Sequence, residues 1–154
     1  MKSKYLFPAI LAACAAIALS GFMSDRSNEQ IAFPDGYRDW THVKTYIVGP
    51  KNPAFKLIGG FNHVYANEQA IKGYMSGDFP DGSVIVSDVI ATLEDSVTIR
   101  EGSRDHIDVM MKDNGVWAFE TFKAGNRMLT VDIEARCVSC HKKEKDMVFS
   151  VYRE

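Results

Sequence analysis

A pair of cysteines near the end of the chain is the feature that most restricts how this sequence can fold. Cys137 and Cys140 are separated by two residues, and His141 follows directly in a chain that ends at Glu154. The remaining cysteine, Cys14, lies far away in an apolar N-terminal run. The fold must therefore build a site for two thiols and an imidazole of one short segment, and the earlier part of the chain has to provide its walls.

Three kinds of site use two cysteines at this spacing. A structural zinc site needs four sulfur or imidazole ligands, and the other histidines, His42, His63 and His106, stand in no paired spacing. A redox-active CxxC pair normally opens a helix after an early strand, whereas this pair lies close to the C-terminus. The third kind is c-type haem, for which Cys-x-x-Cys-His is the attachment signature.

The spacing has a chemical reason in a c-type haem protein. Two thiols three positions apart can form thioethers with the two haem vinyl groups, while the adjacent histidine faces the iron. We therefore favour the haem interpretation over zinc. It predicts one covalently attached haem c, held by Cys137 and Cys140, with His141 as the iron ligand.

The N-terminus has the layout of a secretory signal. Lys2 and Lys4 precede an apolar run that extends from Tyr5 to Met23, and small residues lie near its end. We predict a signal peptide over 1–20, and an uncleaved membrane anchor is the alternative because the run is long enough to span a bilayer. Export to the periplasm agrees with haem c, which bacteria attach outside the cytoplasmic membrane.

The rest of the chain has the size and composition of one domain. We predict a flexible lead-in over 21–32 and a single haem domain over 33–154, without internal repeats. The formal net charge of −2 is spread over mixed acidic and basic residues. This charge gives no footprint for nucleic acid, so we expect no nucleic-acid partner.

Several segments alternate in polarity and are rich in β-branched and aromatic residues, as is typical of strands. We predict strands over 40–48, 61–66, 83–92, 106–113, 116–123 and, after the cysteine motif, 147–152. Asn114-Gly115 tolerates the positive φ angles of a two-residue hairpin turn. The two strands beside it should therefore pair antiparallel.

Short helices fit between these strands. Asn67 can cap a helix through 68–76, with Gly77 ending it. A second helix is predicted from about Val131 or Asp132 through Arg136 and past His141, and a helical turn is predicted over 36–40. The expected fold class is α+β: a predominantly antiparallel β-sheet with two or three short helices.

A family resemblance becomes specific at this point. The segments FPDGYRDWTHVKTY, YANEQAIKGYMSGDFPDGSVIV and the C-terminal CxxCH motif, in this order, resemble the cytochrome P-460 and cytochrome c′-β family from Phe33 to Tyr152. The resemblance implies a homodimer in which each subunit holds one haem with an open sixth iron position. A small periplasmic protein is a further expected partner if the haem transfers electrons.

The resemblance also implies two possible functions. Members of the P-460 branch oxidise hydroxylamine and carry a lysine bonded to the porphyrin, whereas c′-β members bind nitric oxide in an apolar pocket. Lys72 is our candidate for the bonded lysine, and Asp88 is our candidate for a carboxylate that accepts protons. Phe61 and Phe79 are candidates for aromatic caps over the iron. The ordinary alternatives are a solvated lysine, an outward-facing aspartate and core phenylalanines.

A sixth protein ligand would instead make the protein an electron carrier. His42, His63 and His106 are candidates, and upstream methionines such as Met75, Met110, Met111 and Met128 can also be considered. We expect these side chains to have structural roles, because each lies within a predicted element or among core residues. The sequence therefore favours an exported monohaem cytochrome that binds nitric oxide or related small nitrogen compounds at an open iron position.

Overall fold

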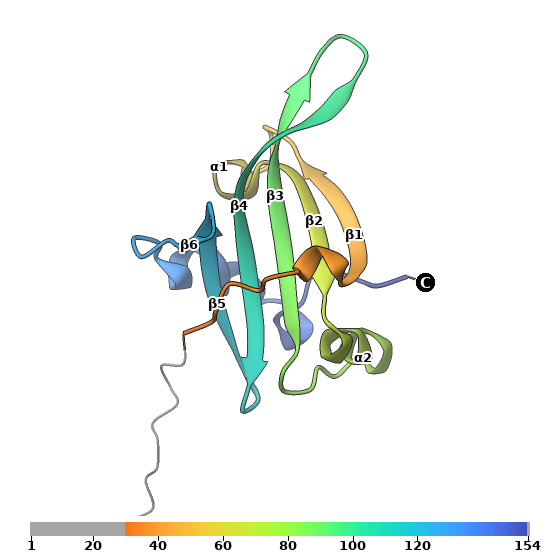
Figure 1. Cartoon of the computed structure of the whole chain (residues 1–154), viewed down its shortest axis with the longest axis vertical. Coiled ribbons are helices and arrows are strands. Elements are labelled where there is room, and N and C mark those ends of the chain that lie inside the picture. Colours follow the sequence, from red (N-terminus) through yellow and green to blue (C-terminus); the bar gives the residue numbers. More distant parts are fainter. Residues whose placement is uncertain (1–29, 154) are drawn as a thin grey trace, which may run out of the picture.

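A computed structural model describes residues 30–153 of the chain. These residues form a six-stranded antiparallel sheet whose strands follow one another in chain order (Figure 1). Short helices accompany the sheet, so the predicted α+β class is confirmed. Within this part of the chain no helix is long and apolar enough to cross a membrane. The predicted signal peptide, and the lead-in up to residue 29, lie outside the described residues.

Each strand has defined bounds. The sheet consists of β1 (Thr41–Val48), β2 (Gly60–Ala66), β3 (Val84–Glu94), β4 (Ile99–Asp113), β5 (Val116–Lys123) and β6 (Asn126–Arg127). The helical segments are η1 (Tyr37–Asp39), α1 (Phe55–Ile58), α2 (Glu68–Ser76), η2 (Glu134–Val138), α3 (Ser139–His141) and η3 (Lys145–Met147).

Local sequence signals explain the elements that were predicted correctly. Asn114 and Gly115 both have positive φ, 49° and 76°, in the turn that joins β4 to β5. The Asn67 side chain accepts a hydrogen bond from the Ala70 backbone and caps α2, and Gly77 ends this helix with a left-handed conformation. Helical structure also runs through the cysteine motif, as predicted.

The hairpin of β3 and β4 is longer than predicted. It extends beyond the other strands as an arm (Figure 1), and its turn is closed where Asp95 Oδ1 accepts hydrogen bonds from the backbones of Val97 and Thr98. The first part of β4, from Ile99 to Asp105, is largely polar and exposed. Because both of its faces meet solvent, the segment lacks the alternation that identifies a half-buried strand.

The predicted strand over 147–152 is wrong. Residues 148–153 have no regular secondary structure. Asp146 and Met147 both adopt left-handed backbone conformations, with φ of 48° and 56°, which are incompatible with an extended strand at this point. Val148 and Tyr152 nevertheless pack on the hydrophobic core, which is why the segment has the apolar pattern of a strand.

The sheet has two differently covered faces. One face contributes Val64, Ala66, Ile85 and Met110 to a core that includes α2 and the segment after the cysteine motif. The other face is covered by the segment before β1, in which Ile31 and Tyr37 are buried against β3, β4 and β5. Figure 1 shows this leading segment crossing one side of the sheet, with the C-terminal segment on the other side.

A buried carboxylate fastens the leading segment to the sheet. Asp88 on β3 is fully buried and accepts hydrogen bonds from the Tyr37 hydroxyl at 2.7 Å, from Arg38 at 2.6 Å and from Arg104 at 2.8 Å. Burial by itself would raise the pKa of Asp88, but these hydrogen bonds together lower it. Burial and the contact with Asp88 raise the pKa of Tyr37 to about 12, so the hydroxyl remains a donor.

Loss of this carboxylate should destabilise the fold. We expect Asp88→Asn to lower the free energy of unfolding by about 2 to 3 kcal/mol, because two arginines and a buried tyrosine lose a charged acceptor. The folded-state pKa of Asp88 is lowered, so its contribution is complete above the unfolded pKa near 3.9 and is lost as the pH falls through the folded pKa. The difference between wild type and variant should therefore be constant near neutral pH and shrink below about pH 4.

Urea unfolding across this pH range measures the effect. Asp39→Asn is the matched control, because Asp39 lies in the same leading segment but is exposed. Equal unfolding curves for the two variants would contradict a fastening role for Asp88.

Candidate haem site

The cysteine motif lies on a short helical segment that closes one side of a cavity. η2 is a π-helix, and α3 continues it through His141. The Asp132 side chain accepts a hydrogen bond from Ala135 N at 3.0 Å near the start of this segment. Single π turns recur at functional sites because they displace side chains from a regular helix. Here the turn brings Cys137, Cys140 and His141 to the same cavity wall.

The cavity measures about 480 Å³ and lies between this helical segment, the sheet and α1. Its lining is mostly apolar and includes Val48, Ile58, Val64, Ile85, Met110 and Phe119. The strands contribute side chains from alternate positions of one sheet face. The C-terminal segment adds Val148, Phe149 and Ser150. The volume and the apolar lining are typical of sites for small organic cofactors.

His141 is held in one orientation. Its Nδ1 donates a hydrogen bond to the Met147 carbonyl oxygen at 2.7 Å. The imidazole packs against Phe119 and Phe149 in T-shaped arrangements, with centroid distances of 5.0 and 4.9 Å. Burial lowers the pKa of His141, although the hydrogen bond to Met147 partly opposes this effect. The ring is therefore neutral at pH 7, and Nε2 keeps the lone pair that a metal ligand needs.

The two cysteines are not joined by a disulfide. Burial, and after it the charge of Asp108, raises the pKa of Cys137 to about 12, whereas Cys140 is exposed. A redox-active CxxC pair depends on a lowered thiol pKa, so this environment disfavours thiol–disulfide exchange. Two reduced thiols beside a cavity are instead suited to form covalent bonds to a cofactor that the cavity would hold.

The loop after the motif is anchored to the sheet by Asp146. This carboxylate accepts hydrogen bonds from Lys112 Nζ at 2.9 Å, from Trp117 Nε1 at 3.0 Å and from Phe79 N at 3.1 Å. These contacts hold Asp146 and Met147 in left-handed conformations, which cost roughly 1 to 3 kcal/mol each outside glycine. Asp146 thus fixes the Met147 carbonyl that orients His141.

A second polar cluster lines the cavity beside Cys137. Arg136 Nη2 donates to His106 Nε2 at 2.6 Å and to the Leu57 carbonyl oxygen at 2.9 Å, so it joins the motif to β4 and α1. Asp108 accepts a hydrogen bond from Thr121 Oγ1 at 2.6 Å and lies 3.4 Å from Arg136. Burial favours a raised pKa for Asp108, but His106 and Arg136 outweigh it and lower the pKa. Asp108 is therefore ionised at neutral pH.

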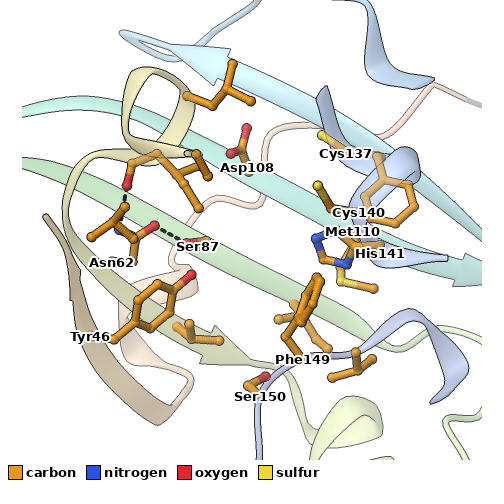
Figure 2. A pocket seen from close by; sticks show the side chains of 18 of the residues that line it. Tyr46, Asn62, Ser87, Asp108, Met110, Cys137, Cys140, His141, Phe149 and Ser150 are labelled. Atoms are coloured by element: carbon orange, nitrogen blue, oxygen red, sulfur yellow. Dashed lines mark hydrogen bonds between the residues drawn. The ribbon is translucent and has the colours of Figure 1, made fainter. Parts of the chain in front are cut away.

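Polar side chains also lie away from His141. Tyr46, Asn62 and Ser87 line the cavity from β1, β2 and β3, and Ser87 Oγ donates to Asn62 Oδ1 at 3.3 Å. Figure 2 shows these three side chains on the side of the cavity away from His141 and Phe149. Lys44 on β1 is a further cavity-lining residue.

These residues fit a haem group. The chain supplies two thiols for the vinyl groups, a neutral imidazole whose other nitrogen donates to a carbonyl, and an apolar cavity of suitable size. Arg136 Nε is also buried without a hydrogen-bond partner among the described residues, which suits a cavity that holds a polar edge of a cofactor. The three motif residues predicted from the sequence are thus brought together.

The other predicted site residues do not line this cavity. Asp88 lies in the ionic cluster on the opposite face of the sheet, and Phe61 stacks on His63 with ring centroids 5.9 Å apart. Phe79 is buried against Trp117 and Tyr74 in the core. Lys72 is exposed on α2, where it donates to the Gln69 side chain at 3.2 Å.

The three remaining histidines have partners within the protein. His42 and His63 share hydrogen bonds with Thr45 at 2.8 Å each, and His106 is buried beside Asp105 and Arg136. None of the three lines the cavity. Within residues 30–153, no cluster of three or more histidine, cysteine or acidic side chains could hold a metal ion. Their expected structural roles therefore agree with the geometry.

Sequence reasoning missed the walls of the cavity. The cavity side chains Lys44, Tyr46, Asn62, Ser87 and Asp108 are spread over β1, β2, β3 and β4, and only the strand register aligns them on one face. The alternation around Asp108, which shares its face with Met110, was the one available signal. Phe119 and Phe149 were missed because their role depends on where the motif packs against the sheet.

Replacement of Asp146 should affect both stability and the imidazole. We expect Asp146→Ala to reduce the free energy of unfolding by roughly 1 to 3 kcal/mol, because the buried Lys112 loses its charged partner. Release of the Met147 carbonyl should also shift the reduction potential of the haem protein. Urea unfolding and potentiometry measure the two effects. Asp78→Ala, at an exposed neighbour of Phe79, is the control, and equal results for both variants would contradict this role.

Comparison with known proteins agrees with the geometry. The family model described as Cytochrome P460 matches residues 34–150, which include the whole sheet and the cysteine motif. No match to the chain is found among curated proteins. The family match covers most of the chain, implies a haem cofactor and confirms the resemblance identified from the sequence. This chain is therefore a haem-binding cytochrome that belongs to the cytochrome P460 family.

Proposed function

We propose that this protein is an exported, periplasmic monohaem c-type cytochrome that binds nitric oxide or a related small nitrogen compound. Cys137 and Cys140 would attach the haem, His141 would be its iron ligand, and the small ligand would bind on the side away from His141. One observation carries the proposal. Among the described residues that line the cavity, His141 is the only histidine, and the only methionine is Met110, which Figure 2 shows beside His141.

The rest of the lining supports an open ligand position. Apart from histidine and methionine, Tyr46 is the remaining candidate for an iron ligand. It would have to bind the iron in its deprotonated phenolate form. Burial raises the pKa of Tyr46 and so disfavours this form at neutral pH. A bound haem supplies an iron centre that takes up small molecules when such a position stays free.

The protein's own residues provide the remaining conditions for binding. Val48, Ile58, Val64 and Ile85 offer an apolar wall, which suits a small uncharged ligand and disfavours water. Phe119 and Phe149 pack against the imidazole. The Met147 carbonyl keeps the proton on Nδ1 and leaves Nε2 directed to the cofactor.

A specific observation keeps hydroxylamine oxidation as a second candidate. Lys44 and the ionised Asp108 both line the cavity, whereas Lys72 and Asp88 do not. In this alternative, Lys44 would be the lysine that bonds the porphyrin. Asp108 is a poor proton acceptor, however, because its pKa is lowered and both of its oxygens already accept hydrogen bonds, from Thr121 and from Arg136. This weak base favours ligand binding over catalysis.

The proposal includes a homodimer. β1 is an edge strand of the sheet, and exposed edges are usually paired or covered. The arm of β3 and β4 also exposes Leu93, Val97 and Ile99. A plain electron carrier with a small periplasmic partner is the remaining alternative, and it would need a sixth protein ligand that the described cavity lining does not offer.

The optical spectrum tests the open position. We expect the oxidised protein, matured with c-type haem, to have a high-spin spectrum, and the reduced protein to bind nitric oxide and carbon monoxide without displacing a protein ligand. The controls His42→Ala and His63→Ala should leave the spectrum unchanged, because both histidines are bound to Thr45 outside the cavity. A low-spin, six-coordinate spectrum that does not respond to nitric oxide would reject the proposal.

Mass spectrometry of the haem peptide separates the binder from the enzyme. We expect only two thioether bonds, to Cys137 and Cys140. The haem peptide from the Lys44→Arg variant should then have the same mass as the wild-type haem peptide. A third covalent bond that disappears in Lys44→Arg but persists in Lys72→Arg would instead establish a lysine-modified haem. It would move the assignment to hydroxylamine oxidation.

A further inference from the structure

We propose that the Tyr46 hydroxyl is a hydrogen-bond donor to the bound small ligand, and that it makes the site select ligands that accept a hydrogen bond. This inference rests on the proposed function, because it concerns the cavity side where the small ligand would bind. It identifies a specificity-determining residue in a cavity whose lining is otherwise mostly apolar. The cavity geometry, the hydrogen bonds of its neighbours and the protonation of Tyr46 carry it.

The position of Tyr46 follows from the strand register. Tyr46 on β1 is the pairing partner of Asn62 on β2, so both side chains lie on the same face of the sheet. Ser87 on β3 reaches the same face and binds Asn62. Figure 2 shows Tyr46 on the side of the cavity opposite His141, with its hydroxyl pointing into the cavity near Ser87. A ligand bound across from His141 would therefore meet this polar group.

The donors of the neighbouring side chains are already used. Asn62 is fully buried, and its Nδ2 donates to the carbonyl oxygens of Ile58 at 2.9 Å and Gly60 at 3.1 Å. The Ser87 hydroxyl donates its only proton to Asn62 Oδ1. Both side chains can thus only accept from the cavity. Ser87 is a hydrogen-bonding neighbour of Tyr46, and because the proton of Ser87 already goes to Asn62, the Tyr46 hydroxyl still has its own proton to donate.

Tyr46 keeps its proton at neutral pH. Burial raises the pKa of Tyr46, and the charge of Asp108 acts in the same direction, while the Ser87 side chain partly opposes both. The Tyr46 residue is 38% exposed and lines the cavity. The phenol can turn its proton toward Ser87 or toward a ligand without moving the ring. Tyr46 is therefore a preorganised donor on a strand.

A donor at this place distinguishes ligands by their chemistry. Ligands that carry negative charge or a basic oxygen gain a hydrogen bond from Tyr46, whereas carbon monoxide gains little. Fluoride is a suitable probe for the oxidised protein, because the bound anion is a strong acceptor. Carbon monoxide is the probe for the reduced protein, because its stretching frequency reports nearby donors.

Tyr46→Phe tests the inference, because it removes the hydroxyl and keeps the ring. We expect fluoride affinity to fall about tenfold, carbon monoxide affinity to change less than about twofold, and the carbon monoxide stretching frequency to rise. Tyr65→Phe is the matched control. Tyr65 lies on β2 but packs on the opposite face of the sheet, against Tyr37 and away from the cavity. This control should leave all three quantities unchanged.

Each other outcome has a separate meaning. Unchanged fluoride affinity and stretching frequency in Tyr46→Phe, with normal ligand binding by the wild type, would overturn the inference and leave the proposed function standing. Equal loss of both ligands would also overturn it, because this pattern indicates general damage to the cavity. A wild-type protein that binds none of fluoride, carbon monoxide and nitric oxide would overturn the proposed function and, with it, the inference.

Discussion

The hydrogen bond between His141 Nδ1 and the Met147 carbonyl is the interaction on which the site depends. It fixes which imidazole nitrogen faces the cavity, and it does so through a backbone segment in a costly conformation. That conformation persists because Asp146 is held by Lys112 and Trp117 on β4 and β5. The pairing of these two strands across Asn114-Gly115 therefore contributes, through Asp146 and the Met147 carbonyl, to the orientation of the His141 imidazole.

The two faces of the sheet have different roles: one stabilises the fold, and the other lines the cavity. Asp88 and its arginines fasten the leading segment on one face, and the cavity occupies the other. Neighbouring positions on one strand therefore have unrelated roles: Ser87 lines the cavity, and Asp88 holds the fold together. The period of two along a strand accounts for this division, because a shift by one residue exchanges the faces.

This period also explains how far the sequence could be read. Alternation predicted where most strands lie, and Asn67, Gly77 and Asn114-Gly115 predicted the ends of α2 and one turn. The motif predicted Cys137, Cys140 and His141 as a group. Alternation alone does not tell which segment covers which face of the sheet. Asp88 and Phe61 were therefore predicted to line the cavity, although their side chains make other contacts outside it. Residues such as Tyr46 and Asn62 become neighbours only through the register of β1 and β2.

The chemistry of the cavity follows from where its polar groups are fixed. Asp108 and Arg136 neutralise each other beside the cysteines, and Lys44 is a further charged side chain of the lining outside this pair. Across from His141 lie the neutral polar side chains of Tyr46, Asn62 and Ser87. All three belong to paired strands. Strands that are hydrogen-bonded within a sheet do not move toward a ligand easily, so their side chains must already be in place. A rigid wall that carries the Tyr46 hydroxyl as a donor therefore supports our proposal that the site discriminates among small ligands.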